Sequence, residues 1–230
     1  MKKNILIIGG SHGIGREVVR MMHKDYQIFT ACRTEGELNS LPVQYQEYDV
    51  LNDSPDALQL PEEIHGFVYC PGSINLRPFK MLSEKDFRED MEVNFFALTC
   101  ILPKVLAKMQ EGSSMVFYST VAVQTGMPFH TSVAAAKGAI EGFARALAAE
   151  YTPKIRVNVI APSLTDTPLA ERLLNNDGKK QKMSERHPLK SVGTAEDMAK
   201  MTTFLLTDDS RWITGQVFKV DGGISALNIN

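Results

Sequence analysis

Ile8-Gly9-Gly10-Ser11-His12-Gly13-Ile14-Gly15 is the stretch of sequence that decides the fold. An apolar run at residues 5–8 leads into it, and residues 16–22 carry apolar side chains at the spacing of one helix face. The pattern predicts a strand, a glycine turn and a helix. Because glycine lacks a Cβ and the helix dipole favours negative charge, such a turn lets backbone N–H groups approach a phosphate. We expect it to bind the pyrophosphate of a dinucleotide, although a tight turn that binds nothing has the same pattern.

Length and composition predict one α/β domain over residues 1–230. The chain has a formal net charge of −2 and 23% charged residues, and its lysines and arginines form no run longer than a pair. This pattern does not favour nucleic-acid binding, so small molecules are the expected partners. The apolar run near Met1 is too short for a signal peptide or a membrane span, and we therefore expect a soluble cytoplasmic protein.

The cysteines predict neither a disulfide framework nor a metal site. Cys32, Cys70 and Cys100 are odd in number, widely spaced and set in apolar surroundings. This usage is typical of buried, reduced thiols in a cytosolic protein. No metal is expected.

A basic residue follows the second predicted strand, which covers residues 26–32. In dinucleotide-binding folds an acidic side chain at this point binds the ribose 2′-hydroxyl, whereas an arginine accommodates a 2′-phosphate. Arg33 stands there, and residues 30–32 offer no carboxylate, which favours NADP(H) over NAD(H). An ordinary solvated arginine is the alternative, and Glu35 nearby would suit NAD(H).

Residues 43–48 predict a third strand, which leads into Asp49 and Val50. This placement would put a carboxylate and a small apolar side chain at the edge of an adenine pocket. Asp49 could equally cap the following turn, because Asp53 and Ser54 supply helix-start chemistry there.

Two further strands deliver candidate site residues. The strand at residues 66–70 is closed by Pro71-Gly72, where glycine allows the backbone to approach a ribose closely; a plain turn is the alternative. The strand at residues 114–118 is followed by Ser119 and Thr120. Ligands in open α/β sheets bind outside the carboxyl ends of the strands, so these hydroxyls are candidates for contacting a substrate carbonyl.

Residues 83–109 predict one long helix that opens with a capping box and that Pro103 could kink. Asn94 is a polar residue within its apolar section. It could bridge backbone groups at a kink or hold a water in the active site.

The predicted helix at residues 133–150 contains eight alanines and two glycines. So small a surface allows another helix to pack closely, which predicts a subunit interface as well as contact with the sheet. Lys137 is its first charged residue and is either a snorkelling surface lysine or a placed ammonium.

The last third of the chain completes the sheet and covers the site. A sixth strand at residues 155–160 is followed by Pro162, Thr165 and Thr167. Residues 168–190 are polar and irregular in pattern, which predicts a mobile substrate lid over about 164–190; a loop without a role is the alternative. With a helix at 194–206 and a seventh strand at 216–220, we expect a three-layer, doubly wound Rossmann fold with a mostly parallel sheet of about seven strands.

In this order the motifs resemble those of the short-chain dehydrogenase/reductase family over essentially the whole chain. Gly9-x-x-x-Gly13-x-Gly15 is similar to its cofactor loop, Asp49-Val50 to its adenine contact and Asn94 to its helix asparagine. Residues 69–72 stand where the family has Asn-Asn-Ala-Gly, and residues 155–162 and 188–223 are similar to its sixth strand and C-terminal signature. The resemblance implies a cofactor site formed by Gly9, Ser11, His12, Gly13, Ile14, Gly15, Arg33, Asp49, Val50, Pro71, Gly72, Asn94, Lys137, Pro162, Thr165 and Thr167.

The resemblance breaks at the catalytic tyrosine. The family transfers hydride between a nicotinamide and a carbonyl or alcohol carbon with a serine, a Tyr-x-x-x-Lys pair and an asparagine-linked water chain. Lys137 matches the lysine, and Thr120, seventeen residues earlier, matches the serine. Val133 stands where the tyrosine is needed, and valine cannot donate a proton. Loss of a general acid typically costs about 10²–10⁴ in rate.

His130 is the predicted substitute for the missing proton donor. It lies seven residues before Lys137, which is the spacing of the tyrosine in the family's divergent enoyl reductases. The two side chains share a helix face if the helix begins early enough. The alternative is a pocket or capping histidine, with Thr131 or Ser132 as the N-cap.

The resemblance therefore implies an NADP(H)-dependent oxidoreductase that acts on a small organic carbonyl or alcohol. In the family the lysine binds the nicotinamide ribose, and that role does not need the phenol. Two alternatives remain: a non-catalytic dinucleotide-binding sensor or scaffold subunit, favoured by Val133, and a double-bond reductase, favoured by the seven-residue spacing. A homo-oligomer, either dimer or tetramer, is expected. The predicted catalytic residues are Thr120, Ser119, Lys137, Asn94 and His130.

Overall fold

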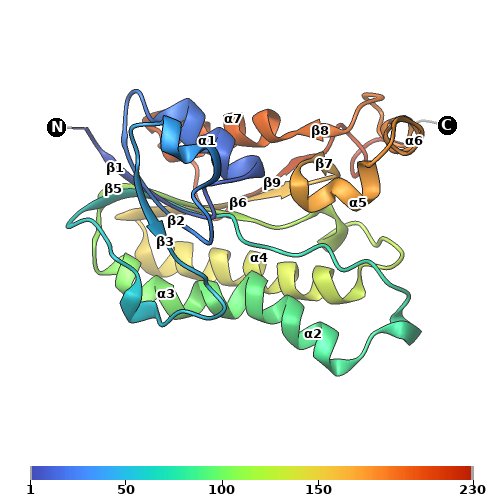
Figure 1. Cartoon of the computed structure of the whole chain (residues 1–230), viewed down its shortest axis with the longest axis horizontal. Helices are drawn as coiled ribbons and strands as arrows, with labels where there is room; N and C mark the ends of the chain where they lie inside the picture. The colour runs from blue at the N-terminus through green and yellow to red at the C-terminus, as the bar shows by residue number, and fades with distance from the viewer. Residues whose placement is uncertain (1, 229–230) are drawn as a thin grey trace.

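A seven-stranded sheet runs through the middle of the molecule (Figure 1). Its strands lie in the order β3-β2-β1-β4-β5-β6-β9, and every neighbouring pair is parallel. The computed structural model describes residues 2–228. The strands of the sheet are β1 (Asn4–Ile8), β2 (Gln27–Cys32), β3 (Gln44–Glu47), β4 (Ile64–Tyr69), β5 (Met109–Tyr118), β6 (Ile155–Pro162) and β9 (Val217–Val220).

Helices cover both faces of the sheet because the strands are apolar on both sides. In β1, Ile5 and Ile7 pack into one core, whereas Leu6 and Ile8 pack into the other. Figure 1 shows α1 and α7 on one face and α3 and α4 on the opposite face. This arrangement confirms the predicted three-layer, doubly wound fold. The helices are α1 (Gly13–Met22), α2 (Glu84–Met91), α3 (Ala97–Leu106), α4 (Thr131–Tyr151) and α7 (Ala195–Leu206).

The site lies where the strand order reverses, between β1 and β4. In such sheets the loops that leave the two central strands diverge to opposite faces and open a crevice at the carboxyl edge. Here the two loops touch at their bases, since a Cβ on Gly9 would lie 3.2 Å from Cδ of Pro71. The glycine turn and the loop after β4 therefore form adjacent walls of one site.

The helix predicted over residues 83–109 is wrong in its middle and at its end. Its capping box is present, with Ser83 and Asp86 each bonding the other's backbone N–H. Between α2 and α3, however, Glu92–Phe96 form a turn of π-helix (η4), so the irregularity lies around Asn94 rather than at Pro103. A π-turn inserts an extra residue into the helix, and no local sequence pattern predicted it. The chain then turns into β5 at residue 109, so α3 ends at Leu106.

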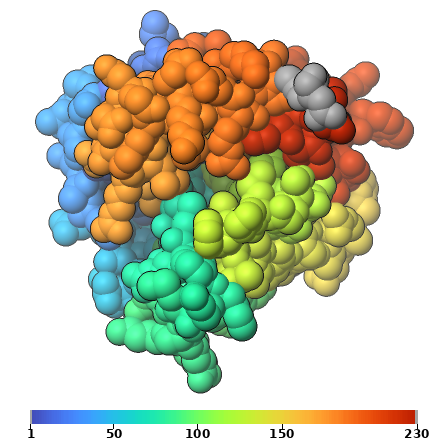
Figure 2. Space-filling model, turned by 90° about the vertical axis from the view of Figure 1, so that its right-hand side faces the viewer, coloured from blue at the N-terminus to red at the C-terminus, as the bar shows by residue number. Residues whose placement is uncertain are grey.

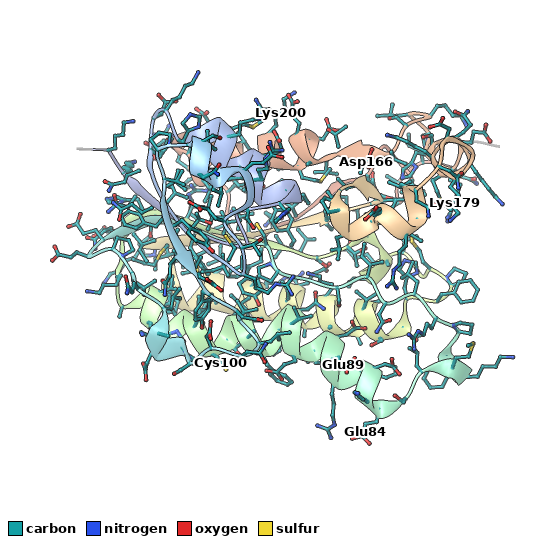
Figure 3. The ribbon with its side chains drawn as sticks, in the orientation of Figure 1. Glu84, Glu89, Cys100, Asp166, Lys179 and Lys200 are labelled. Atoms are coloured by element: carbon teal, nitrogen blue, oxygen red, sulfur yellow. The ribbon has the colours of Figure 1, made fainter. Side chains whose placement is uncertain are left out.

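The segment 164–190 is ordered into secondary structure and is not irregular as predicted. β7 (Thr165–Asp166) pairs with β8 (Gly193–Thr194) at its base. Between them lie η6 (Pro168–Ala170), α5 (Glu171–Leu174) and α6 (Asp177–Glu185), and Figure 3 labels Asp166 on β7 and Lys179 on α6. These helices were not predicted because their sequence is polar and has few apolar residues at helical spacing. A small apolar cluster packs beneath them, with Ala170, Leu174 and Val192 as its buried residues.

Smaller expectations also differ from the structure. Cys32 is buried and Cys70 half-buried, but Cys100 is exposed on the outer side of α3 (Figure 3), so the three free thiols are not all buried. Strand β5 begins five residues before the predicted start at 114, and β6 continues to Pro162. No helix within residues 2–228 has both the length and the apolar character of a membrane span.

Candidate active site

The glycine turn leaves the N-terminus of α1 open. Gly9 and Gly13 have φ angles of +82° and +53°, which side chains with a Cβ rarely adopt. A Cβ on Gly15 would collide with the carbonyl of Gly9, so the turn and the helix pack directly on each other. His12 is the N-cap but makes no capping hydrogen bond through its side chain, and the first turn contains no acidic residue. The free N–H groups of this turn therefore suit an anion.

A cavity of about 350 Å³ opens beside this helix end. Figure 2 faces this edge of the molecule, where residues 164–190 (orange) lie over the loops that follow β4 (teal) and β5 (yellow-green). Most of the predicted site residues meet here. Those that line the cavity are Gly9, His12, Gly13, Ile14, Gly15, Gly72, Ser119, Thr120, His130, Lys137, Pro162, Thr165 and Thr167.

Lys137 reaches the cavity from α4 as a placed ammonium and not as a snorkelling surface lysine. The residue is only 7% exposed, and its Nζ donates a hydrogen bond to the backbone oxygen of Tyr118 at 2.9 Å. Burial lowers the pKa of Lys137 from 10.5 to about 8, and interactions with Cys70 and Asp90 oppose that change. Within residues 2–228 its other N–H groups have no partner, so they can bind hydroxyls in the cavity.

The two hydroxyls after β5 have different roles. Ser119 Oγ donates its proton to Glu141 Oε1 at 2.6 Å, so that proton is not available to a substrate oxygen. Thr120 Oγ1 accepts a bond from the backbone N–H of Ala122 at 3.3 Å, which leaves its own proton free. Of the two candidates, Thr120 is therefore the one that can donate to a substrate oxygen.

His130 is the N-cap residue of α4, so the predicted N-caps Thr131 and Ser132 are wrong. Its Nδ1 donates to the carbonyl of Pro128 at 2.7 Å, because a carbonyl can only accept. The neutral ring therefore presents Nε2 as an acceptor. Val133, on the first turn of α4, is 5% exposed and lines the cavity with an apolar side chain.

Asn94 lies behind the cavity wall at the π-turn. It is fully buried, and its Nδ2 donates to Ser73 Oγ at 2.8 Å and to the backbone oxygen of Asp90 at 2.7 Å. Its Oδ1 has no partner within the described residues. A Cβ on Gly72 would lie 3.1 Å from that oxygen and 3.2 Å from Lys137 Nζ, so the glycine leaves a gap that both polar groups face. Asn94 thus bonds the backbone at the π-turn, and its binding of a water in the active site stays a prediction.

Arg33 and Asp49 lie outside the cavity lining. Arg33 is exposed directly after β2 and forms no ion pair within residues 2–228, so it is free to meet a ligand. Asp49 caps its own turn, since its carboxylate accepts from Leu51 N–H at 3.0 Å and from Asn52 Nδ2 at 2.9 Å, and its contact with an adenine stays a prediction. The Leu51 bond is the main reason that the pKa of Asp49 is lowered.

The remaining predicted residues support the walls of the site. Ser11 is buried with Oγ 2.9 Å from His12 Nδ1, and Val50 packs against the core. Thr165 Oγ1 donates to the backbone oxygen of Ser163 at 3.0 Å, which braces the chain where it leaves β6. Pro71 packs against the glycine turn, as described above.

Sequence reasoning missed several polar residues of the site. Ser73 and His187 line the cavity, and Asp90 is buried behind it. His187 Nε2 lies 2.9 Å from Ser163 Oγ. Ser73 could have been predicted because it directly follows Gly72, a predicted site residue. Asp90 and His187 occupy no recognisable motif.

The donor set fits a nicotinamide dinucleotide. The open N-terminus of α1 suits its pyrophosphate, the spare N–H groups of Lys137 suit ribose hydroxyls, and Gly72 keeps the space beside that ammonium clear. All three features face one cavity.

Comparisons with known proteins agree with this arrangement. Residues 55–225 match the family model described as enoyl-(acyl carrier protein) reductase. The 3-oxoacyl-(acyl-carrier-protein) reductase FabG of Chlamydia muridarum is 36% identical, with 98% of each chain covered. The L-xylulose reductase of Bos taurus is 27% identical, with 97% of each chain covered.

Solved structures show the same fold. A short-chain dehydrogenase family protein from Francisella tularensis superposes with a TM-score of 0.89 at 21% identity, over 99% of this chain and 100% of that one. An ElxO variant with NADPH bound superposes with a TM-score of 0.86 at 25% identity, over 99% of this chain and 100% of that one. From these matches, the sheet topology and the placement of the glycine turn and Lys137, we conclude that the chain belongs to the short-chain dehydrogenase/reductase family of oxidoreductases.

Proposed function

We propose that this protein is an NADP(H)-dependent oxidoreductase that interconverts a carbonyl and an alcohol on a small organic substrate. The observation that carries the proposal is the single cavity that joins the α1 N-terminus, the buried Lys137 ammonium and the free Thr120 hydroxyl. The proposal is also supported by the relatives described above, a 3-oxoacyl-(acyl-carrier-protein) reductase and an L-xylulose reductase.

Each residue has a defined task in this proposal. The glycine turn and the α1 N-terminus hold the pyrophosphate, and Lys137 holds the nicotinamide ribose. The bound cofactor supplies or accepts the hydride. Thr120 donates a hydrogen bond to the substrate oxygen, which stabilises the negative charge that develops there during reduction. Asn94 keeps the backbone of the π-turn in place and offers its free Oδ1 to a water.

His130 is a proton donor only in its charged form. Because Nδ1–H bonds to Pro128, the neutral ring has no second proton to give from Nε2. We therefore expect His130→Ala to leave the rate of NADPH-dependent reduction close to that of the unmodified protein. A large loss of rate in this variant would show that His130 takes part in the proton transfer.

The cofactor preference rests on Arg33. A 2′-phosphate adjacent to this exposed guanidinium forms a charge-assisted contact that NADH cannot form. We expect NADPH to bind more tightly than NADH in a fluorescence titration, and Arg33→Ala to remove at least tenfold of that preference, since a hydrogen bond to a charged group contributes about 1.5–3 kcal/mol. Arg211→Ala, which removes another exposed arginine, serves as the charge control. Equal affinities in the unmodified protein would contradict the NADP(H) assignment.

Turnover separates this function from its rivals. We expect NADPH oxidation with members of a panel of ketones and aldehydes, a kcat about 100-fold lower in Thr120→Ala, and activity retained in Thr120→Ser, because only the alanine removes the hydroxyl. NADPH binding without turnover of any substrate would favour the non-catalytic alternative. Reduction of enones alone would favour a double-bond reductase, which the name of the matched family model also suggests.

The lining of the cavity indicates the kind of substrate. Its lining includes many apolar side chains, and half of the six named below belong to the lid segment, so the panel should favour carbonyls with an apolar body. These six apolar side chains are Leu76, Met127, Leu169, Leu173, Met183 and Ile224.

A further inference from the structure

A buried carboxylate lies directly behind the wall of the cavity. Asp90, on α2, is 1% exposed, and its Oδ1 accepts a hydrogen bond from Ser73 Oγ at 2.6 Å. Ser73 in turn accepts from Asn94 Nδ2 at 2.8 Å. The O–H···O distance is in the range of a charge-assisted bond. The three side chains form one connected network between the cavity and the interior of α2.

Burying this network lowers the free energy of unfolding, which is hard to explain if the network serves only to hold the fold. A buried carboxyl group needs hydrogen-bond or charge partners, and Asp90 Oδ2 has none within the described residues. The unpaired Oδ1 of Asn94 lies close by. The titratable groups that face this region are Lys137 from α4 and Cys70 from the end of β4, and Asp90 lies near enough to Lys137 to act on its charge. Each unpaired buried polar atom of this kind calls for an explanation, and a catalytic role is one that fits two such atoms beside a cavity.

Ser73 connects the carboxylate to the cavity. Its hydroxyl has one proton and two lone pairs. The proton goes to Asp90 and one lone pair accepts from Asn94, so one lone pair is left. Ser73 lines the same cavity as Lys137 and Thr120. A substrate hydroxyl in the cavity can therefore donate to Ser73 while Ser73 donates to Asp90.

We propose that Ser73 and Asp90 form a hydroxyl–carboxylate proton relay that replaces the phenol absent at Val133. The inference rests on the proposed function. In the oxidative direction the substrate O–H proton moves to Ser73 Oγ as the Ser73 proton moves to the Asp90 carboxylate. The O–H bond electrons form the carbonyl π bond, and the hydride that leaves the carbon, with its two electrons, would be accepted by a bound nicotinamide. Reduction reverses each transfer. Ser73 is the catalytic residue, and Asp90 acts through it.

Kinetics distinguish a relay from a structural brace. Asp90→Asn keeps the shape and can still accept from Ser73, but it cannot take up a proton. We expect kcat to fall about 100-fold or more with NADPH affinity unchanged, and the pH dependence of kcat to change shape. Ser73→Ala should also lower kcat without changing NADPH affinity. Ser73→Thr keeps the hydroxyl and should retain activity. Asp86→Asn is the matched control on α2, because it weakens the capping box without touching the cavity.

The result that overturns the relay is an Asp90→Asn enzyme with the kcat and pH profile of the unmodified protein. Thermal unfolding and NADPH titration establish that each variant is folded. A loss of stability shared by Asp90→Asn and Asp86→Asn, with no change in the pH profile of either, would assign Asp90 to structure alone.

Infrared spectroscopy tests the relay without turnover. We expect an infrared band of the hydrogen-bonded carboxyl group that disappears in Asp90→Asn, shifts in Ser73→Ala and persists in Asp86→Asn, both in the free protein and with NADPH bound. Absence of any Asp90-dependent band that Ser73→Ala shifts would overturn the relay even if the protein reduces carbonyls. If the band is present but no substrate is turned over, the reductase assignment fails and the relay can no longer serve that reaction.

Discussion

The buried ammonium of Lys137 makes stability depend on pH. Burial lowers its pKa to about 8 in the folded protein, against 10.5 in the unfolded chain. Between these two pH values the unfolded chain binds more protons than the folded protein. The free energy of unfolding therefore rises with pH across this window, by up to about 3 kcal/mol. Below about pH 8 the folded protein bears the full cost of burying the charged ammonium. Urea titrations at several pH values should show this rise in the unmodified protein and in Lys200→Met, an exposed control on α7 (Figure 3), but not in Lys137→Met. An identical rise in Lys137→Met would refute the assignment.

Val133 offers a second route for the proton. It lies one helical turn before Lys137, so a phenol at this position would enter the cavity beside the ammonium. If proton transfer limits the rate of Asp90→Asn, adding Val133→Tyr should raise its kcat at least tenfold, because a general acid typically contributes about 10²–10⁴. Val133→Phe fills the same space without a hydroxyl and should not rescue. Equal rates for the two double variants would show that the added hydroxyl carries no proton.

The sequence could predict residues whose roles follow from spacing along one or two elements. Thr120 and Lys137 were identified by their match to the serine and lysine of the family's motif, which fixes their interval, and the folded chain brings both to one cavity. The sequence could not choose between Ser119 and Thr120, since their orientations depend on how β5 leaves the sheet. It missed the contact between Ser73 and Asp90 because a loop and a helix seventeen residues apart meet only in the folded protein.

At the scale of elements, the polar helices of the lid and the π-turn were the hardest features to predict. Periodicity identified α2 and α3 as helical, but a π-turn changes the pairing of carbonyls and N–H groups without a distinct residue pattern. The lid helices have few apolar positions, so their sequence resembles that of a loop. The parallel strands, by contrast, are buried on both faces and appear as short apolar runs.

The mobility of the lid is a prediction at this scale. Helix α6 buries none of its residues, and α5 is only four residues long. Few contacts therefore oppose local opening of the lid. Hydrogen exchange followed by mass spectrometry should show residues 168–190 exchanging faster than α7 in the free protein. NADPH with a substrate analogue should slow exchange in the lid while α7 changes little. Protection of the free lid equal to that of α7 would contradict the prediction.

At the scale of the whole molecule, sheet order alone locates the site. A doubly wound sheet must have a crevice where its strand order reverses, and here the chain leaves β1 and β4 on the two sides of that crevice. The position of the cavity therefore followed from the order of strands and glycine turns. The sequence set its location, whereas the tertiary packing of α2 and the lid set the chemistry of its walls.

Assembly is the remaining property of the whole molecule. The outward positions of α4 include Ala135, Gly142 and Ala149, and a Cβ on Gly142 would meet no atom within 4 Å. A helix from a second copy can approach such a surface closely, so we expect a dimer or tetramer by light scattering after gel filtration. Gly142→Lys should give a smaller species without unfolding, because lysine is a better helix former than glycine but its long charged side chain blocks close approach. Glu196→Lys on α7 should leave assembly unchanged, and a monomeric unmodified protein would refute the prediction.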